Sequence, residues 1–417
     1  MIGALRGFAS FDLPSRMLMI NQFAINLGFY MLMPYLAGYL SGTVGLAVWM
    51  VALVLGVRNF AQQGMFLIGG TLADRLGYKP LIVAGCLLRT GGFGLLALVD
   101  SLAALLIASA ATGFAGALFN PAVRAYLAAD AGERRVEAFA LFNMFYQAGM
   151  LAGPLVGVAL MALDFRTTAL GAAAVFAILT LAQLWALPQH HGESEPRVSS
   201  VWQDWRIILA NRRFVGFSAA MIGCYVLSFQ VYLALPMQAS FLSGPASPTG
   251  LVTAIFVVFG VVSVAGQLRI TAWFTDHWGT DRGLVAGVVI LSAAFVPPLL
   301  APSAALWGTG VAVAALLCCA ALLAIGSAAV FPFEMDTIVT LSGNRLVATH
   351  YGFYNTVIGI GILLGNLGTG AVLDTARDAG FGALAWAGLI AIGATSALGL
   401  RTVQRYPRLQ PAPAAIG

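Results

Sequence analysis

Charged residues are scarce in this chain. Only 9% of its 417 residues carry a charge, and Lys79 is the only lysine, whereas soluble proteins normally carry about 25% charged residues. Hydrophobic residues make up 60% of the chain, and the mean hydropathy is +0.90. A water-soluble fold is excluded, because no soluble core of this size could bury so much apolar surface.

Residues that commonly serve in catalysis or metal binding are also few. The four cysteines all lie inside apolar runs, where small packing residues are expected rather than disulfides or metal ligands; they are Cys86, Cys224, Cys318 and Cys319. The chain has four histidines and no HExxH, His/Cys metal spacing or P-loop. We therefore expect no enzyme activity, ATP hydrolysis, metal or cofactor. The net charge of +5 does not indicate nucleic-acid binding, because the basic residues lie in short loops.

Long apolar runs are what the sequence has instead. They are long enough to cross a bilayer, which requires roughly 20 residues per helix, and they lack the alternation of a transmembrane β-barrel. Hydropathy predicts an all-α integral membrane protein with about twelve spans. The predicted spans are 17–41, 46–68, 80–99, 102–127, 136–162, 167–187, 214–240, 249–274, 283–301, 305–332, 348–373 and 381–400.

The longest polar stretch divides these spans into two sets of six. It predicts an N-terminal bundle at 1–187, a cytoplasmic linker at 188–213 and a C-terminal bundle at 214–417. Within the linker, VWQDWRIIL could form an amphipathic helix on the membrane surface. An ordinary linker with two interfacial tryptophans explains the same residues equally well.

The basic residues predict the orientation of the chain. Those between spans fall almost entirely on the side shared by both termini, and only Arg166 and Arg377 fall on the other side. Cytoplasmic loops carry the excess of positive charge, so both termini are expected in the cytoplasm. The residues on that side are Arg75, Lys79, Arg124, Arg134, Arg135, Arg197, Arg206, Arg212, Arg213, Arg282, Arg345, Arg401, Arg405 and Arg408.

The two halves repeat each other. The segment 139–157 is similar to 350–368 when Asn143 is aligned with Asn355, and WFTDHWGTDRG at 273–283 is a degraded copy of TLADRLGYKPL at 71–81. Since the copies keep the same span order, the halves should be related by an axis along the membrane normal. Substrate would then bind between the halves near mid-membrane.

The most distinctive stretch is GGTLADRLGYKP at 69–80, between the second and third predicted spans. We expect it to form a tight charged turn. It resembles the signature loop of the major facilitator superfamily and departs from it only at Tyr78, where that family has an arginine. We expect a conformational latch on the cytoplasmic side, made by Gly70, Asp74, Arg75, Gly77 and Lys79. Asp74 would accept hydrogen bonds from free N–H groups near His350 to Gly352, at the start of span eleven.

A second motif lies in span five. Gly149, Gly153, Pro154 and Gly157 resemble the antiporter motif of drug:proton exchangers. Glycines four residues apart also let two helices approach closely, so simple helix packing explains the same spacing.

Polar side chains inside the spans are the candidate lining of a substrate cavity. Arg58 and Arg89 lie near the middle of spans two and three, where a charge costs about 2.5–3.5 kcal/mol and usually faces a cavity or a partner. Hydrogen bonding between helices is the alternative for the amides. The candidate lining is Asn21, Asn26, Tyr30, Arg58, Gln62, Arg89, Asn143, Gln230 and Asn355.

Acidic residues are rarer still. Glu334 and Asp336, near the cytoplasmic end of span ten, are the candidate proton carriers by elimination, and a gate salt bridge or a solvated helix cap is the alternative for both. Arg124 occupies the matching place in the N-terminal half and is a candidate partner.

Residues 17–400 are similar to the MdtH group of multidrug resistance proteins, most closely in spans one to three. The resemblance implies a monomeric bacterial inner-membrane transporter that exports amphipathic drugs in exchange for protons, within membrane lipid. The alternative is an exporter or flippase of an anionic amphiphile or a lysophospholipid-like substrate. Three positions depart from the group: Asn21 and Asn120 stand where it has acids, and Ser109 where it has an arginine.

Overall fold

The computed structural model describes residues 2–161, 164–188, 200–243, 249–303, 308–378 and 383–405, and all regular elements in these ranges are helices. The N-terminal half contains α1 (Ile2–Ala9), α2 (Leu13–Tyr30), α3 (Met33–Gly42), α4 (Val48–Gln63), α5 (Phe66–Leu76), α6 (Tyr78–Leu98), α7 (Leu102–Ala131), η1 (Gly132–Arg134), α8 (Arg135–Met161) and α9 (Phe165–Ala186). The remainder contains α10 (Val201–Ala210), α11 (Arg212–Ser228), η2 (Phe229–Val231), α12 (Ala234–Ser243), α13 (Thr249–Ala293), α14 (Val296–Leu300), α16 (Thr309–Ser342), α17 (Val347–Asp378) and α18 (Ala383–Arg405).

These helices make twelve crossings. By length and composition, eight helical stretches of the described chain could each cross a membrane, and the bent pair α4–α5 gives a ninth. Two of the eight, Leu102–Leu160 and Gly250–Leu300, have 59 and 51 residues, more than one bilayer crossing requires. The chain reverses inside both, at Gly132 and Gly279, whose φ angles are positive. The pair α2–α3 supplies the remaining crossing.

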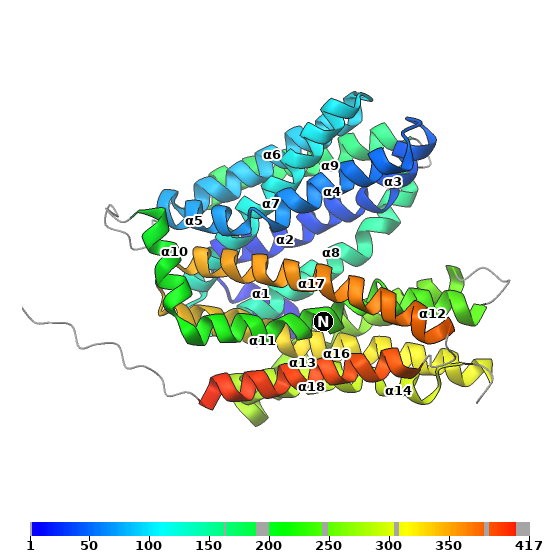
Figure 1. The fold of residues 1–417 in the computed structure, drawn as a ribbon. Helices are drawn as coiled ribbons and strands as arrows, with labels where there is room; N and C mark the ends of the chain where they lie inside the picture. The colour runs from blue at the N-terminus through cyan, green and yellow to red at the C-terminus, as the bar shows by residue number, and fades with distance from the viewer. Residues whose placement is uncertain are drawn as a thin grey trace, which may run out of the picture.

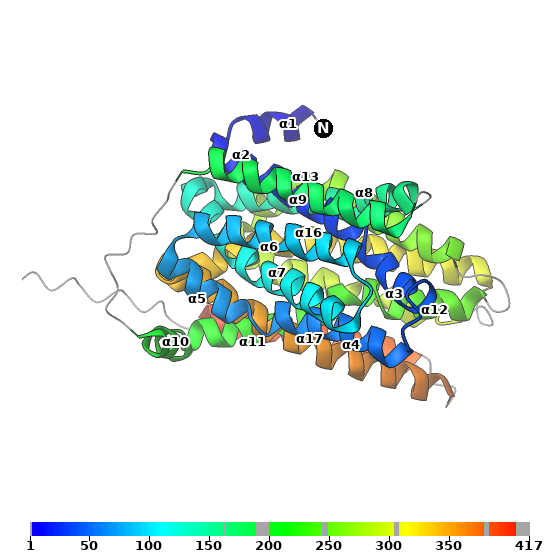
Figure 2. The same ribbon diagram turned by 90° about the horizontal axis from the view of Figure 1, so that it is seen from above.

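The crossings form two groups. Figure 1 shows α2 to α9 in one group and α11 to α18 in the other, with α10 beside both, and Figure 2 gives the view from above. The turn after α5, α10 and the final residues of α18 lie at the same end of the molecule, which we call the linker end. Residues 189–199 of the predicted linker lie outside the described residues.

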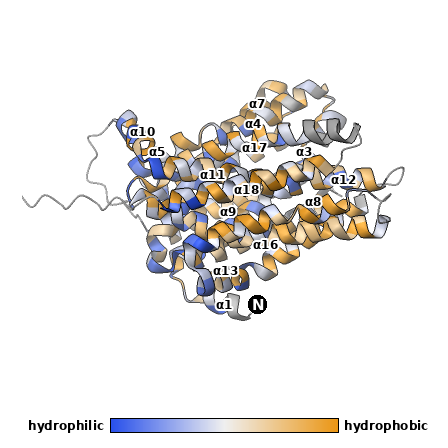
Figure 3. Cartoon of the chain, turned by 60° about the horizontal axis from the view of Figure 1, so that its bottom comes forward, coloured by the Kyte–Doolittle hydropathy of each residue, from blue (hydrophilic) through white to orange (hydrophobic). Residues whose placement is uncertain are grey.

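Hydropathy varies along the crossings. In Figure 3 hydrophilic residues gather around α5 and α10 at the linker end, and the long flanks of the helices are mainly hydrophobic. The flanks expose large apolar side chains such as Trp185, Leu155 and Leu364. Exposed apolar surface over this length is what a bilayer-facing wall requires.

The charged turn is shorter than the sequence suggested. Residues 69–76 are the last part of helix α5, and only Gly77, with φ 92°, separates it from α6. A left-handed residue stops one helix and starts the next without a loop. The prediction of a turn over 69–80 was therefore wrong in extent, because the charged residues that indicated a loop lie on helical turns.

Residues 201–210 are helical, and their cap explains why. Ser200 accepts a bond from the N–H of Gln203, and the Gln203 side chain accepts one from the N–H of Ser200. This reciprocal capping box fixes where α10 begins. Its inner face buries Asp204 and Ile208, whereas Trp202 and Leu209 are exposed.

The glycines of the fifth crossing are contact points between helices. A Cβ at Gly149 would lie 2.3 Å from the carbonyl oxygen of Phe23, and one at Gly157 would lie 2.3 Å from that of Met31. Helix α8 therefore packs directly on the backbone of α2. At Gly153 a Cβ would lie 2.6 Å from Tyr30, and the carbonyl of Pro154 accepts a bond from Tyr35.

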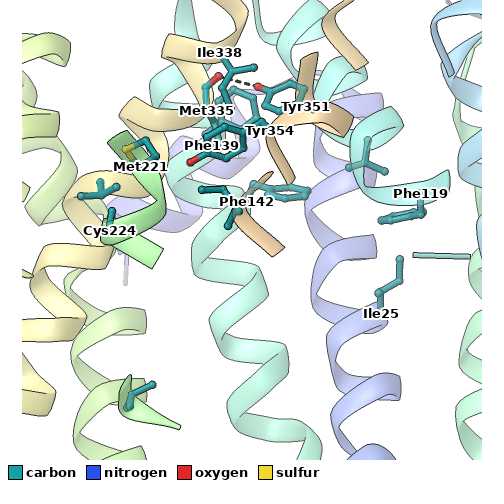
Figure 4. Close-up of a cluster of buried hydrophobic side chains, with 14 of the residues drawn as sticks. Ile25, Phe119, Phe139, Phe142, Met221, Cys224, Met335, Ile338, Tyr351 and Tyr354 are labelled. Atoms are coloured by element: carbon teal, nitrogen blue, oxygen red, sulfur yellow. Dashed lines mark hydrogen bonds between the residues drawn. The ribbon is translucent and has the colours of Figure 1, made fainter. Parts of the chain in front are cut away.

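An aromatic cluster joins the two groups near the linker end. Figure 4 shows Phe139 and Phe142 of α8 close to Tyr354 of α17, with the Tyr351 hydroxyl donating to the Met335 carbonyl at 2.8 Å. These side chains are buried. Packing and hydrogen bonding thus hold α8, α16 and α17 together where the two groups meet.

Candidate functional site

Asp74 connects the two groups at the linker end. Its carboxylate accepts hydrogen bonds from the N–H of Ala348 at 3.2 Å, the N–H of Thr349 at 2.7 Å and the Thr349 hydroxyl at 2.6 Å. These N–H groups belong to the first turn of α17, where no intrahelical acceptor is available. The partners lie slightly earlier than the expected His350–Gly352, because α17 begins at Val347.

Two glycines bring the backbones together around this contact. A Cβ at Gly70 would lie 2.1 Å from the carbonyl oxygen of Ala348, and one at Gly352 would lie 2.4 Å from that of Phe66. No side chain larger than hydrogen fits at either position. Gly70 and Gly352 thus set the approach of α5 to α17 that lets Asp74 reach its donors.

The other charged residues of the signature, Arg75 and Lys79, make contacts outside the C-terminal group. Arg75 forms an ion pair with Asp204 of α10 at 2.6 Å, and the Trp205 indole donates to Thr71 at 2.9 Å. Lys79 donates to the carbonyl of Leu184, at the end of α9. Asp74 and Gly70 therefore contact the C-terminal group, Arg75 contacts the linker helix and Lys79 stays within the N-terminal group.

Asp336 and Arg135 form another bridge between the groups. The pair is 3.0 Å apart, and Arg135 also donates to Asn344. Asp336 is therefore in a salt bridge at the linker end, which was the alternative weighed against a role as proton carrier.

A cavity of about 490 Å³ lies between the groups, bounded by residues from both. Most lining side chains are aromatic, amide or hydroxyl groups, and Arg124 and Glu334 are its only charged members in the described chain. The lining is Gln22, Tyr30, Gln62, Gln63, Phe66, Asn120, Arg124, Asn143, Tyr146, Gln147, Cys224, Tyr225, Ser228, Phe229, Tyr232, Phe259, Ser327, Val330, Phe331, Glu334, Asn355, Ile358, Gly359 and Ile362.

Glu334 occupies the C-terminal wall of this cavity. It is 1% exposed and accepts a bond from the Tyr225 hydroxyl at 2.7 Å. The Tyr354 ring meets Tyr225 edge-on. Arg124, from the opposite group, donates to Asn355 at 2.9 Å. Glu334 and Arg124 therefore face one cavity without forming an ion pair with each other.

Five of the predicted lining residues lie behind the cavity surface. Asn21 and Arg89 are buried inside the N-terminal group, and Asn26 donates to the Gln22 carbonyl of its own helix. Gln230 donates to Val226 and Asn366, and Arg58 donates to Gln62. Hydropathy determines neither the rotation of a helix nor the depth of the cavity along it, so it could not separate these side chains from those that border the cavity.

The other predicted lining residues do border the cavity: Tyr30, Gln62, Asn143 and Asn355. Asn143 also donates to Gln267 of α13 at 2.7 Å, a bond between the groups. Gln147 also borders the cavity and was not predicted, although its position one helical turn after Asn143 could have identified it. Nothing in the sequence distinguishes Ser327 or Phe259 from ordinary packing residues.

A latch between two helical groups and a cavity lined by residues of both groups define a membrane transporter of the two-bundle type. The model of the Major Facilitator Superfamily matches residues 18–366, and the chain belongs to that superfamily. It is an integral membrane protein and not an enzyme.

Relatives are similar over nearly the whole chain. An uncharacterized MFS-type transporter of Mycobacterium tuberculosis (strain ATCC 25618 / H37Rv) is 60% identical over 97% of this chain and 96% of its own. The multidrug resistance protein MdtH of Cronobacter sakazakii is 30% identical over 94% and 95%. The resemblance to MdtH proteins predicted from the sequence is confirmed.

Solved structures share the fold. The fucose:proton symporter FucP of E. coli superposes with a TM-score of 0.76 at 14% identity, covering 94% of this chain and 99% of FucP. The human organic anion transporter MFSD10 gives 0.65 at 16% identity, with coverage of 94% and 99%. The predicted fold class, two six-helix bundles, is thereby confirmed.

Proposed function

We propose that this protein is a monomeric secondary transporter that exports amphipathic solutes, drugs among them, in exchange for protons. It would lie in the bacterial cytoplasmic membrane with both termini in the cytoplasm. The proposal assigns 1–187 and 214–417 as the two moving bundles and 188–213 as their linker. The relatives named for multidrug resistance support the export role.

The observation that carries the proposal is the buried Glu334 in the wall of a cavity shared by the two halves. A carboxylate that is 1% exposed and faces a substrate cavity can gain or lose a proton as the cavity opens to either side. In the N-terminal half, Asn21 and Asn120 stand where the MdtH group has acids. Glu334 therefore takes the proton-coupling role, with Tyr225 as its hydrogen-bond donor.

The cavity lining supports an amphipathic cargo. Aromatic rings such as Phe229, Phe259 and Phe331 lie beside the amides of Gln63 and Gln147. Apolar walls with a few polar groups are typical of small-molecule sites. Closure at the linker end by Asp74 and Arg135 would make the described conformation the one that opens away from the cytoplasm.

The test is transport by the purified protein in proteoliposomes. Glu334→Gln should abolish uphill transport driven by a pH gradient while sparing downhill exchange. Asp336→Asn is the matched control, because this acid is two residues away and salt-bridged outside the cavity lining. It should retain pH-driven accumulation, at a rate lowered by the loss of the linker-end salt bridge.

If Glu334→Gln still concentrates substrate against a gradient, the proposed coupling is wrong. Loss of accumulation in Asp336→Asn but not in Glu334→Gln would assign the proton to the salt bridge instead.

A further inference from the structure

Two arginines inside the crossing helices form no ion pair with an acid in the described part of the chain. Among the described residues, the ion pairs are made by Arg75, Arg134, Arg135 and Arg166. Neither Arg58 of α4 nor Arg89 of α6 takes part in one. A cation at this depth normally faces water or a counter-charge, so the pair requires an explanation.

Arg89 is held by aromatic rings on the faces of its guanidinium. Its Cζ lies 5.4 Å from the Phe176 ring centroid and 5.7 Å from that of Phe119. Rings stabilise a cation electrostatically but accept no hydrogen bond in its plane. One terminal nitrogen, Nη1, is buried without a hydrogen-bond partner, and the residue is only 6% exposed.

Gly116 of α7 leaves a gap that joins Arg89 to the cavity wall. A Cβ at this position would lie 3.2 Å from Arg89 Nη2 and 3.2 Å from the side-chain amide carbon of Gln62. The guanidinium and the amide therefore meet across a residue with no side chain. Gln62 is itself part of the cavity lining.

Arg58 bonds directly to the same amide. Its Nη2 donates to Gln62 Oε1 at 2.8 Å, and its guanidinium lies 4.4 Å from the Phe29 ring centroid. Its Nε is buried without a partner. Arg58 also lies close enough to Arg89 and Tyr30 to interact with both electrostatically.

The cluster therefore contains two positive charges, an amide that accepts a bond from Arg58 and lies near Arg89, and N–H donors without a partner behind the cavity lining. Like charges in a poorly solvated region repel each other, and an anion placed between them would relieve that repulsion. Arginine also offers planar donor pairs that match carboxylate and phosphate oxygens.

We propose that Arg58, Arg89 and Gln62 form a subsite for the anionic head group of an amphiphile, a carboxylate or phosphate, whose apolar tail lies in the aromatic cavity. The inference rests on the proposed function, since the ligand is the transporter's cargo. Gln62 would rotate to admit the head group from the cavity to both guanidinium groups.

Binding to the full-length protein tests the subsite. The protein is placed in phosphatidylcholine nanodiscs, and equilibrium dialysis measures its affinity for submicellar dodecyl phosphate, dodecyl glucoside and dodecyltrimethylammonium. Inorganic phosphate and nanodiscs containing phosphatidylglycerol form two further arms. Wild type should bind dodecyl phosphate about 10-fold more tightly than the neutral glucoside, because charge-assisted hydrogen bonds are added.

Arg58→Gln and Arg89→Gln should each bring that ratio close to one while leaving glucoside binding unchanged. The matched control is Arg269→Gln, which removes an exposed arginine of α13 and should leave the ratio intact. Gly116→Ala should lower the ratio by narrowing the gap.

The most informative variant is Gln62→Glu, which keeps the shape of the side chain but places a carboxylate near both arginines. It should raise the melting temperature and abolish the preference for dodecyl phosphate. It also decides the matter if the arginine variants fail to fold. A raised melting temperature with the preference unchanged would show the cluster to be structural only, as would equal losses for all three amphiphiles in the arginine variants.

The remaining arms separate the possible sources of the head group. Competition by phosphatidylglycerol that depends on Arg58 would show that a bilayer lipid can occupy the subsite. Inorganic phosphate binding as tightly as dodecyl phosphate would overturn the role of the tail. Absence of pH-driven transport for every amphiphile would refute the proposed function, whereas the binding ratio would still decide this inference.

Discussion

The turn at Gly77 and its copy at Gly279 share a backbone conformation, with φ of 92° and 67°, but differ in what surrounds them. In the first copy Asp74 is buried and bonded to the start of α17. In the second copy Asp276, at the equivalent position, is exposed. Both copies therefore have the turn, but only the first copy has a buried aspartate that bonds to the other half.

The two copies also differ in whether a glycine lies on the helix before the turn. Gly70 lies against the Ala348 carbonyl, where a Cβ has no room. The equivalent position in the second copy is Ala272, which is exposed. A turn that must only reverse the chain needs Gly77 or Gly279, whereas a turn that must also dock on the other half needs a further glycine on the helix before it.

Gly70→Ala should have the largest effect on conformation and transport. The added methyl would lie 2.1 Å from a backbone oxygen, and overpacking of this kind costs about 1–3 kcal/mol or more. The halves should separate at the linker end, and transport should fall to near background. Spin labels on the linker ends of α7 and α16 would report the widening as a longer distance distribution.

The control for that experiment is Ala272→Gly in the second copy. It should leave both the distance distribution and transport unchanged. An unaltered distribution in Gly70→Ala would show that the close approach of α5 to α17 does not hold this conformation.

Asp74→Asn should have the next largest effect. The amide keeps one acceptor but loses the charge, which weakens its bonds to the α17 N-terminus by about 1–2 kcal/mol. The population should shift roughly 10-fold toward the conformation open at the linker end. The same spin labels measure the shift, and folding should be unaffected.

Asp276→Asn is the matched change in the copy, and it should produce no shift because its side chain is exposed. Equal shifts in both variants would attribute the effect to surface charge rather than to the latch.

Part of the fold and of the candidate site could be predicted from the sequence. The spans, the two halves and the contact of Asp74 with span eleven follow from hydropathy, repetition and an acid that topology did not explain. The position of Arg89 between Phe119 and Phe176 does not, because it depends on the rotation of α6 against α7 and α9. Hydropathy also does not separate Gln62 of α4, which borders the cavity, from Arg58, one turn earlier on the same helix face, which does not.

Arg75 and Asp204 should respond unequally to truncation. Asp204 has a side chain only 2% exposed, against 25% for Arg75, so Arg75→Ala leaves the more buried charge without its arginine. We expect Arg75→Ala to destabilise the protein by about 1 kcal/mol, and the double variant Arg75→Ala/Asp204→Ala to recover part of that loss. Melting temperatures in nanodiscs provide the measurement.

The equivalent of Arg75 in the copy is His277, which is exposed and stacks on Trp273. His277→Ala should change the melting temperature by less than Arg75→Ala. A double variant no more stable than Arg75→Ala would contradict the idea that a buried carboxylate causes the loss.

Lys79→Gln should give the smallest effect of the series. The ammonium donates to the Leu184 carbonyl at 2.9 Å, where the last turn of α9 presents unpaired carbonyl groups and the negative end of its dipole. Removing the charge should cost about 0.3–1 kcal/mol, seen as a small fall in melting temperature that vanishes at high salt.

The equivalent residue in the copy is Asp281, whose backbone carbonyl accepts a bond from Gln404 of α18. Asp281→Asn should leave that bond intact, because the backbone carbonyl makes it. A salt-independent loss in Lys79→Gln would show that the lysine acts through the packing of its stem rather than through its charge.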